Sequence, residues 1–172
     1  LPKKEIARET QYTLSKPLQK MRERILLYKS DSNSLYFEAL LYGGEFLTKL
    51  VLGFLVAGIN DDKERSRYRF EHELVRADGL GFWADMMQKL FSGPAFVSLD
   101  AAAKKQVKEL TERVRAPDWR YLACEKLRRV LSVLLIDETP LPAKVSLQQW
   151  FVDFTRLRNK TRGHGAPRLS QI

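Results

Sequence analysis

The stretch that decides the fold is LYFEALLYGGEFLTKLVLGFLVAGI, residues 35–59. Most of its positions are apolar, and they do not alternate with polar ones as in a half-buried strand. Its charged residues Glu38, Glu45 and Lys49 are spaced by seven and then four positions. On a helix these spacings give a single narrow stripe. The stretch therefore predicts a central helix with one edge toward water, and Glu45 and Lys49 as an ordinary ion pair one turn apart.

Helical spacing continues on both sides of this stretch, and Gly- and Pro-containing turns separate the segments. A cap and early proline at Ser15 and Pro17 open the first helix, and either Ser98 or Asp100 caps a later one. The residues expected to face inward are Leu18, Met21, Ile25 and Tyr28; Phe82, Trp83, Met86, Met87 and Leu90; Val107, Leu110 and Val114; and Leu122, Ala123, Leu127, Val130, Leu131 and Leu134. The sequence thus predicts an all-α bundle of five to seven helices.

Charged residues mark the expected outer faces of these helices. The run of both signs at residues 63–76 is typical of a solvated face. In the helix that follows Pro117, four basic residues are expected to point outward: Arg120, Lys126, Arg128 and Arg129.

The 172 residues fit one domain, with a helical N-terminal extension at 1–34, a core bundle at 35–167 and a tail at 168–172. The chain begins with Leu1 rather than Met, so we expect it to be part of a longer protein. The strongly apolar part of the central helix, residues 46–59, contains Lys49 and is shorter than the roughly 20 residues that span a bilayer. Cys124 is the only cysteine. These features predict a cytoplasmic protein without a membrane segment, and a buried structural thiol rather than a nucleophile.

The balance of charge points to polyanionic partners. Lys and Arg number 30 against 21 Asp and Glu, a formal net charge of +9. Such an excess favours nucleic acid, because each neutralised phosphate releases condensed counterions. Acidic proteins and lipids are alternatives that charge alone leaves open.

The last helix places an arginine on an apolar face. The sequence SLQQ at 146–149 has the form of a capping box and predicts the start of this helix. At 100° per residue, its apolar face consists of Leu147, Trp150, Phe151, Phe154 and Leu157. Arg158 falls on the same face, whereas Arg156 points away from it. Either Arg158 extends its charge to solvent at the helix end, or the face opens into a cleft or subunit interface that uses the charge.

The segment that follows, RNKTRGHG at 158–165, groups basic residues around one histidine. His164 can accept and donate a proton near neutral pH, and Arg158 or Arg162 can hold a phosphate and stabilise developing charge. In RNA these groups suffice for attack of the 2′-hydroxyl on the adjacent phosphate. The only other histidine is His72, so the sequence predicts no metal site and no cofactor.

Helix geometry separates the two central residues of this segment. In an unbroken helix Arg158 and His164 lie about 120° apart in rotation and about 9 Å apart along the axis. Either Gly163 turns His164 out of the helical register, or two copies of the chain supply the two residues across a symmetry axis.

A helical domain that ends in Arg-Asn-x4-His resembles the HEPN superfamily, whose motif is an Arg, four to six residues and a His, often with a polar residue after the Arg. Here these are Arg158, Asn159 and His164, and the helix at 36–56 resembles the family's early core helix. The resemblance extends over residues 35–167. It implies a metal-independent RNA endoribonuclease acting as a homodimer, in host defence, toxin–antitoxin or RNA-processing systems, commonly as one module of a larger polypeptide.

In this hypothesis His164 is the general acid and base, Arg158 is the phosphate and transition-state ligand, and Asn159 orients the histidine or a phosphate oxygen. Single-stranded RNA is the expected substrate, and the homodimer is expected to form through the face that carries the last helix. The residues expected to position the substrate are Lys160, Thr161 and Arg162. The alternative is a catalytically silent dimerisation or scaffold module that signals within a multidomain defence or toxin–antitoxin protein. A third alternative is nucleic-acid binding without cleavage.

Overall fold

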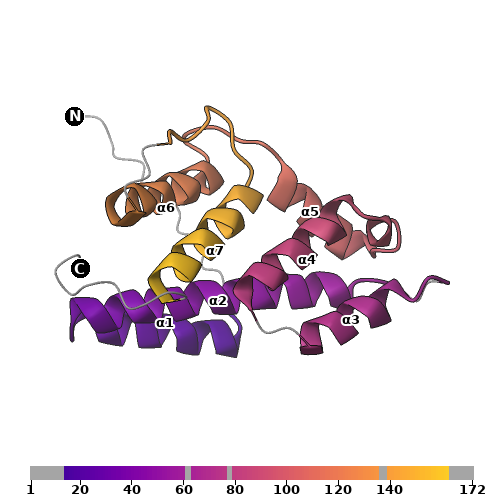
Figure 1. Ribbon diagram of the computed structural model, residues 1–172, viewed down its shortest axis with the longest axis horizontal. Coiled ribbons are helices and arrows are strands. Elements are labelled where there is room, and N and C mark those ends of the chain that lie inside the picture. Colours follow the sequence, from indigo (N-terminus) through magenta and orange to yellow (C-terminus); the bar gives the residue numbers. More distant parts are fainter. Residues whose placement is uncertain (1–13, 61–62, 77–78, 136–138, 163–172) are drawn as a thin grey trace, which may run out of the picture. The chain divides into compact units, whose positions relative to one another are not determined.

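The computed structural model describes residues 14–60, 63–76, 79–135 and 139–162. Within these ranges the chain is all α-helical, as predicted, and no strand is formed (Figure 1). The helices are α1 (Lys16–Lys29), α2 (Asn33–Ala57), α3 (Ser66–Arg76), α4 (Leu80–Ser92), the 3-10 helix η1 (Pro94–Phe96), α5 (Ala101–Thr111), α6 (Trp119–Leu135) and α7 (Gln148–Arg162). Two isolated bridges, Ile59 with Leu99 and Val114 with Val145, join the connecting segments.

The chain forms two compact units, residues 1–43 and 44–172, which divide inside α2. In the first unit, α2 begins two residues earlier than predicted, because the Ser32 hydroxyl accepts a hydrogen bond from the Leu35 amide at 3.1 Å and caps the helix. The Arg24 guanidinium lies 5.6 Å from the centre of the Tyr28 ring and 5.5 Å from that of Tyr42. The predicted stripe of α1 is partly buried and consists of Leu18, Met21, Ile25 and Tyr28.

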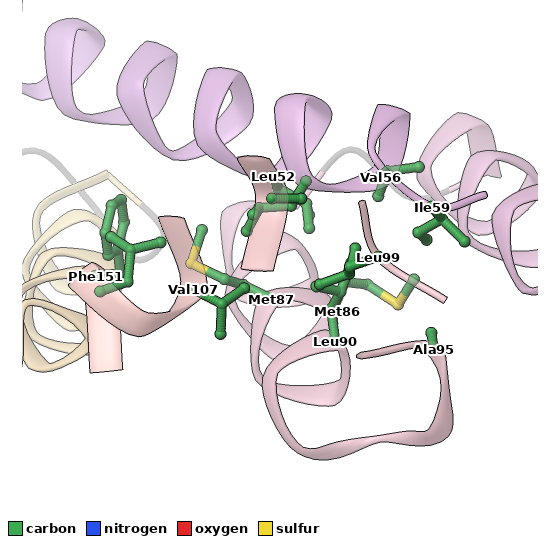
Figure 2. Close-up of a cluster of buried hydrophobic side chains, with 13 residues drawn as sticks. Leu52, Val56, Ile59, Met86, Met87, Leu90, Ala95, Leu99, Val107 and Phe151 are labelled. Atoms are coloured by element: carbon green, nitrogen blue, oxygen red, sulfur yellow. The ribbon is translucent and has the colours of Figure 1, made fainter. Parts of the chain in front are cut away.

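The core of the second unit is built from the second half of α2 together with α4 and α5 (Figure 2). The methionine stripe of α4 belongs to this core, as predicted, and its burial stabilises the fold by about 1.5–3 kcal/mol per large side chain. The buried residues that form the cluster include Leu52, Leu55, Val56 and Ile59; Met86, Met87 and Leu90; Val107 and Leu110; and Phe151.

Helix α2 is longer than its most apolar part. It has 25 residues and is long and apolar enough, by length and composition, to cross a membrane. The prediction of a stretch too short to span a bilayer concerned residues 46–59 alone, whereas the whole helix runs from Asn33 to Ala57. Leu52 and Leu55 are nevertheless 0% exposed and pack in the core cluster, which is the packing of a central helix.

The capping predictions agree with some helix ends and not with others. Ser15 precedes α1, but its side chain makes no capping hydrogen bond, and α7 begins at Gln148, two residues after Ser146. Ser98 and Asp100 were the two residues predicted to cap α5. The structure uses Asp100, whose carboxylate accepts a hydrogen bond from the Ala103 amide at 2.7 Å. Gly93 ends α4 with a hydrogen bond to the Lys89 carbonyl, and a Cβ on Gly93 would lie only 2.3 Å from that oxygen. No other residue fits this turn without a shift of the backbone.

Two of the basic residues of α6 do not point outward as predicted. The side chains of Arg120 and Arg128 are each 14% exposed. Arg120 pairs with Asp118 and Glu112, both at 2.9 Å, and its hydrogen bonds hold the pKa of Asp118 below the ordinary value. Conversely, Leu122 and Val130, which were expected inside, are 38% and 39% exposed. Asp118 directly precedes α6, whereas Glu112 lies at the end of α5 and Asp153 lies in α7. Helical spacing within α6 alone could not reveal these partners.

Helices α2 and α7 approach closely at Gly44. A Cβ on Gly44 would lie 2.2 Å from the Cζ atom of the buried Phe154 ring. The absence of a side chain at this one position therefore sets how near α7 comes to α2. By contrast, a Cβ on Gly53 of the same helix would meet no atom within 4 Å.

We expect Gly44→Ala to lower the free energy of unfolding by about 1–3 kcal/mol, because the methyl group overpacks the site of Phe154. Gly53→Ala is the matched control, and it should raise stability by up to about 1 kcal/mol through helix propensity alone. Urea unfolding followed by circular dichroism measures both. Equal and favourable effects of the two changes would show that the close approach at Gly44 does not constrain the fold.

Candidate functional site

Helix α7 carries the candidate site and is held on several sides within its own unit. It packs against α6 and α4 (Figure 1), and its Phe154 meets α2 at Gly44. Three residues of the predicted apolar face are buried, with Phe151, Phe154 and Leu157 at 6%, 3% and 4% exposure. The other two, Leu147 and Trp150, are partly buried. The Trp150 ring stacks on Phe154 with their centres 5.0 Å apart.

Arg158 lies on this face and is bound to an acidic residue. Its Nε donates a hydrogen bond to Glu45 Oε1 at 2.8 Å. The side chains are 28% and 17% exposed. Arg158 is therefore neither fully extended into solvent nor unpaired, and its charge is fixed over α2. Arg156, which was expected to be solvated, is exposed.

The expected pair of Glu45 with Lys49 is corrected by this geometry. Glu45 turns to α7, and the Lys49 ammonium lies 5.4 Å from the centre of the Trp83 ring of α4. Glu45 is thus a residue of the candidate site that sequence reasoning missed. Its position on the charged stripe of the central helix was visible in the sequence, but its partner was not.

The Glu45–Arg158 pair and the Gly44–Phe154 contact belong to one crossing. Gly44 and Glu45 are consecutive in α2, while Phe154 and Arg158 are one turn apart in α7. The close packing of Phe154 on Gly44 therefore brings the next turn of α7 to the carboxylate of Glu45. This arrangement restricts the Arg158 guanidinium to a position beside the Glu45 carboxylate.

The other predicted site residues that the structure describes differ in how far they are exposed. Asn159 faces α4, since a Cβ on Gly81 would lie 3.6 Å from its Nδ2, and Lys160 is exposed. Thr161 is 4% exposed, and its hydroxyl donates to the Leu157 carbonyl at 2.9 Å, so the hydroxyl is buried and bonded to the backbone of its own helix. Arg162 is the last residue of α7, and its side chain lies outside the described residues, as does His164 together with its flanking glycines.

A second ion pair holds α7 from the side of α6. The Arg128 guanidinium and the Asp153 carboxylate are 2.9 Å apart, and Asp153 is 3% exposed. Burial raises the pKa of Asp153 above its ordinary value, against the opposing effects of the Gln149 amide and the Arg128 charge. Asp153 was missed in the sequence, because a carboxylate at the edge of an apolar stripe is ordinarily solvated.

The single cysteine lies beside this pair. Cys124 is buried, as predicted, and its thiol donates toward the Ser146 carbonyl at 3.7 Å. Burial, together with the charge of Asp153, raises the pKa of the thiol to about 11. A thiol in this state is a poor nucleophile at neutral pH, so Cys124 has a packing role.

The part of the chain that the structure describes contains no cluster of metal ligands. No group of three or more His, Cys, Asp or Glu residues there could hold a metal ion.

Comparison of the chain with protein-family models, with curated proteins and with solved structures finds no match. Any functional assignment therefore depends on the residues and geometry described above.

We expect Asp153→Ala to lower the free energy of unfolding by about 3–5 kcal/mol, because it leaves the Arg128 charge buried without its carboxylate. The double variant Arg128→Met with Asp153→Leu should recover most of this loss, since an apolar pair of similar size replaces the ion pair. Thermal and urea unfolding measure the difference. A loss in the double variant as large as in Asp153→Ala would contradict this explanation.

Proposed function

We propose that this protein is a metal-independent endoribonuclease, similar to the HEPN superfamily, which cleaves single-stranded RNA as a homodimer. The observation that carries the proposal is the Arg158 guanidinium, fixed by Glu45 near the end of the last helix. This end of α7 leads directly into the segment that contains His164.

The fixed guanidinium suits a phosphate ligand. Of its nitrogens, only Nε is bonded to a residue that the structure describes. The two terminal nitrogens therefore remain for the paired oxygens of a phosphate, which an arginine binds in a bidentate manner. A guanidinium held in place before the reaction stabilises developing negative charge without the cost of reorganisation.

The chemistry requires one proton to be removed and one to be supplied. In the proposed reaction His164 accepts the proton of the ribose 2′-hydroxyl, and the 2′-oxygen attacks phosphorus. The bond from phosphorus to the 5′-oxygen breaks, and the same histidine, now protonated, donates its proton to that leaving oxygen. The products are a 2′,3′-cyclic phosphate and a 5′-hydroxyl, and Arg158 bears the charge of the pentacoordinate transition state.

A homodimer brings two such segments together. The apolar face of α7 is buried within its own chain, so a two-fold contact on that face would have to displace α2, α4 or α6. The proposed contact therefore uses the C-terminal end of α7 and the residues beyond it. With this arrangement the histidine of one copy can approach the Arg158 of the other across the two-fold axis.

The proposal predicts RNA cleavage by the purified chain in EDTA. His164→Ala should lower the rate by about 10²–10⁴, the usual cost of losing a positioned acid–base group, and Arg158→Ala should be similarly impaired. Arg156→Ala is the matched control, since it removes the same charge from an exposed position of the same helix. Cleavage by both single variants at the parent rate would eliminate the catalytic assignment.

Glu45 is proposed as a positioning residue that acts through Arg158. Glu45→Gln should lower kcat up to about 100-fold while KM changes little, because a displaced guanidinium stabilises the transition state poorly. Glu38→Gln, the same change two turns earlier in α2, should leave both constants unchanged. A higher kcat in Glu45→Gln would mean that the carboxylate competes with the phosphate instead of positioning its ligand.

The catalytically silent dimerisation or scaffold module remains a second proposal, and the same ion pair supports it. Glu45 and Arg158 are 113 residues apart in the chain. A pair between such distant segments can have the purely structural role of holding α7 on α2. This proposal predicts dimers in solution and no cleavage of RNA. It also predicts that Phe154→Ala, which loosens the packing of α7 on α2, impairs the protein more than His164→Ala does.

A further inference from the structure

A groove of about 240 Å³ lies between α4 and α7. Its apolar lining includes Met87 and Phe151, which are 1% and 6% exposed and belong to the core (Figure 2). The side-chain amides of Gln88 and Gln148 meet across one part of the groove. The groove therefore has a rigid floor, and polar groups border it.

Two polar groups of this groove have no hydrogen-bond or ion-pair partner among the described residues. Asp85 is exposed, and its carboxylate makes no hydrogen bond or ion pair with the described part of the chain. The Thr155 hydroxyl oxygen is buried and likewise has no hydrogen-bond partner among those residues. A buried hydroxyl without a partner costs about 1–3 kcal/mol, so a ligand that bonds to it would offset that cost.

The groove leads to the candidate catalytic residues. Its wall on α7 runs through Gln148, Val152 and Thr155, and helical spacing continues this line to Asn159. Asn159 and Thr155 both border Gly81 at the start of α4, where a Cβ would lie 3.6 Å from Asn159 Nδ2 and 4.0 Å from Thr155 Cγ2. Along the helix axis, Thr155 is about 4.5 Å from Arg158 and about 6 Å from Asn159. A group bound beside Thr155 thus lies about one turn from both residues.

We propose that this groove binds one base of the RNA, next to the phosphate that is cleaved, and that the base it prefers is guanine. The proposal rests on the endoribonuclease function proposed above. Single-stranded RNA can turn its bases outward, where apolar and aromatic side chains pack on them and polar side chains read the Watson–Crick edge. The apolar floor formed by Met87 and Phe151 suits the base plane, and Asp85 and Thr155 suit its edge.

The preference for guanine follows from the hydrogen-bonding groups. A carboxylate only accepts hydrogen bonds, and guanine is the base with two neighbouring donors, N1–H and the N2 amino group, on its Watson–Crick edge. Adenine and cytosine each place a ring-nitrogen acceptor beside their single amino group, and uracil flanks its single N–H with two carbonyls. Each of these would set an acceptor against the Asp85 carboxylate. The Thr155 hydroxyl can donate to guanine O6 or accept from a base amino group.

The test measures binding separately from cleavage. The probes are uridine oligonucleotides whose central base is guanine, hypoxanthine, adenine, cytosine or uracil, with 2′-O-methyl riboses that lack the attacking hydroxyl. Fluorescence anisotropy with the full chain should give tighter binding of the guanine oligonucleotide by about tenfold. Hypoxanthine, which lacks the N2 amino group, should lose a large part of this advantage.

Two variants assign the preference to the groove. Asp85→Asn should bring the ratio of guanine to adenine affinity close to one. Glu109→Gln is the matched control, because it removes the same charge from an exposed position of α5 and should leave the ratio unchanged. The ratio is the readout because the loss of any negative charge raises affinity for all RNA.

The outcomes separate this proposal from the function on which it rests. Equal affinity for all five oligonucleotides overturns the guanine site, even if unmodified RNA is cleaved, and so does a preference that Asp85→Asn leaves intact. A guanine preference that depends on Asp85, in a chain that cleaves no unmodified RNA, would support the base site and overturn the endoribonuclease. A preference lost equally in Glu109→Gln would assign it to net charge and overturn the site.

Discussion

The ion pair between Glu45 and Arg158 depends on the close crossing of α2 and α7 at Gly44, where no side chain larger than hydrogen fits against Phe154. Gly44 lets the Phe154 ring come against the backbone of α2, and the next turn of α7 then meets the Glu45 carboxylate at 2.8 Å. Both charges are largely removed from water, so either one alone would be costly. The pair therefore fixes both the position of α7 and the direction of the Arg158 guanidinium.

Helical spacing predicted much of the fold and only part of the candidate site. It placed Arg158 on the apolar face of the last helix and identified the methionine stripe of α4 as core, because both depend on periodicity within one helix. It paired Glu45 with Lys49 instead of Arg158, and it turned Arg128 outward instead of toward Asp153. In each case the true partner lies on another helix, and the sequence of one helix carries no information about what packs against it. The role of His164 stays a prediction, since this residue lies outside the described ranges.

Helix α7 combines structural and proposed functional roles along its length. Its first turns meet α6 through Asp153 and the core through Phe151, which makes the helix a rigid support. Its last turns carry Arg158, Asn159 and Lys160 toward the segment with His164. Residues on a packed helix hold their positions better than residues on a loop, and catalysis of phosphoryl transfer depends on such positioning. The net charge of +9 suits an RNA partner for the same surface.

The most direct test of the two-fold site is to mix inactive variants. Arg158→Ala and His164→Ala proteins are combined, allowed to exchange subunits, and assayed for RNA cleavage in EDTA. If one copy supplies the arginine and the other the histidine, half of the dimers are mixed and each of these has one intact site of two, so about a quarter of the parent activity returns. If the mixture stays as inactive as its two components while subunit exchange is demonstrated, a shared site is contradicted.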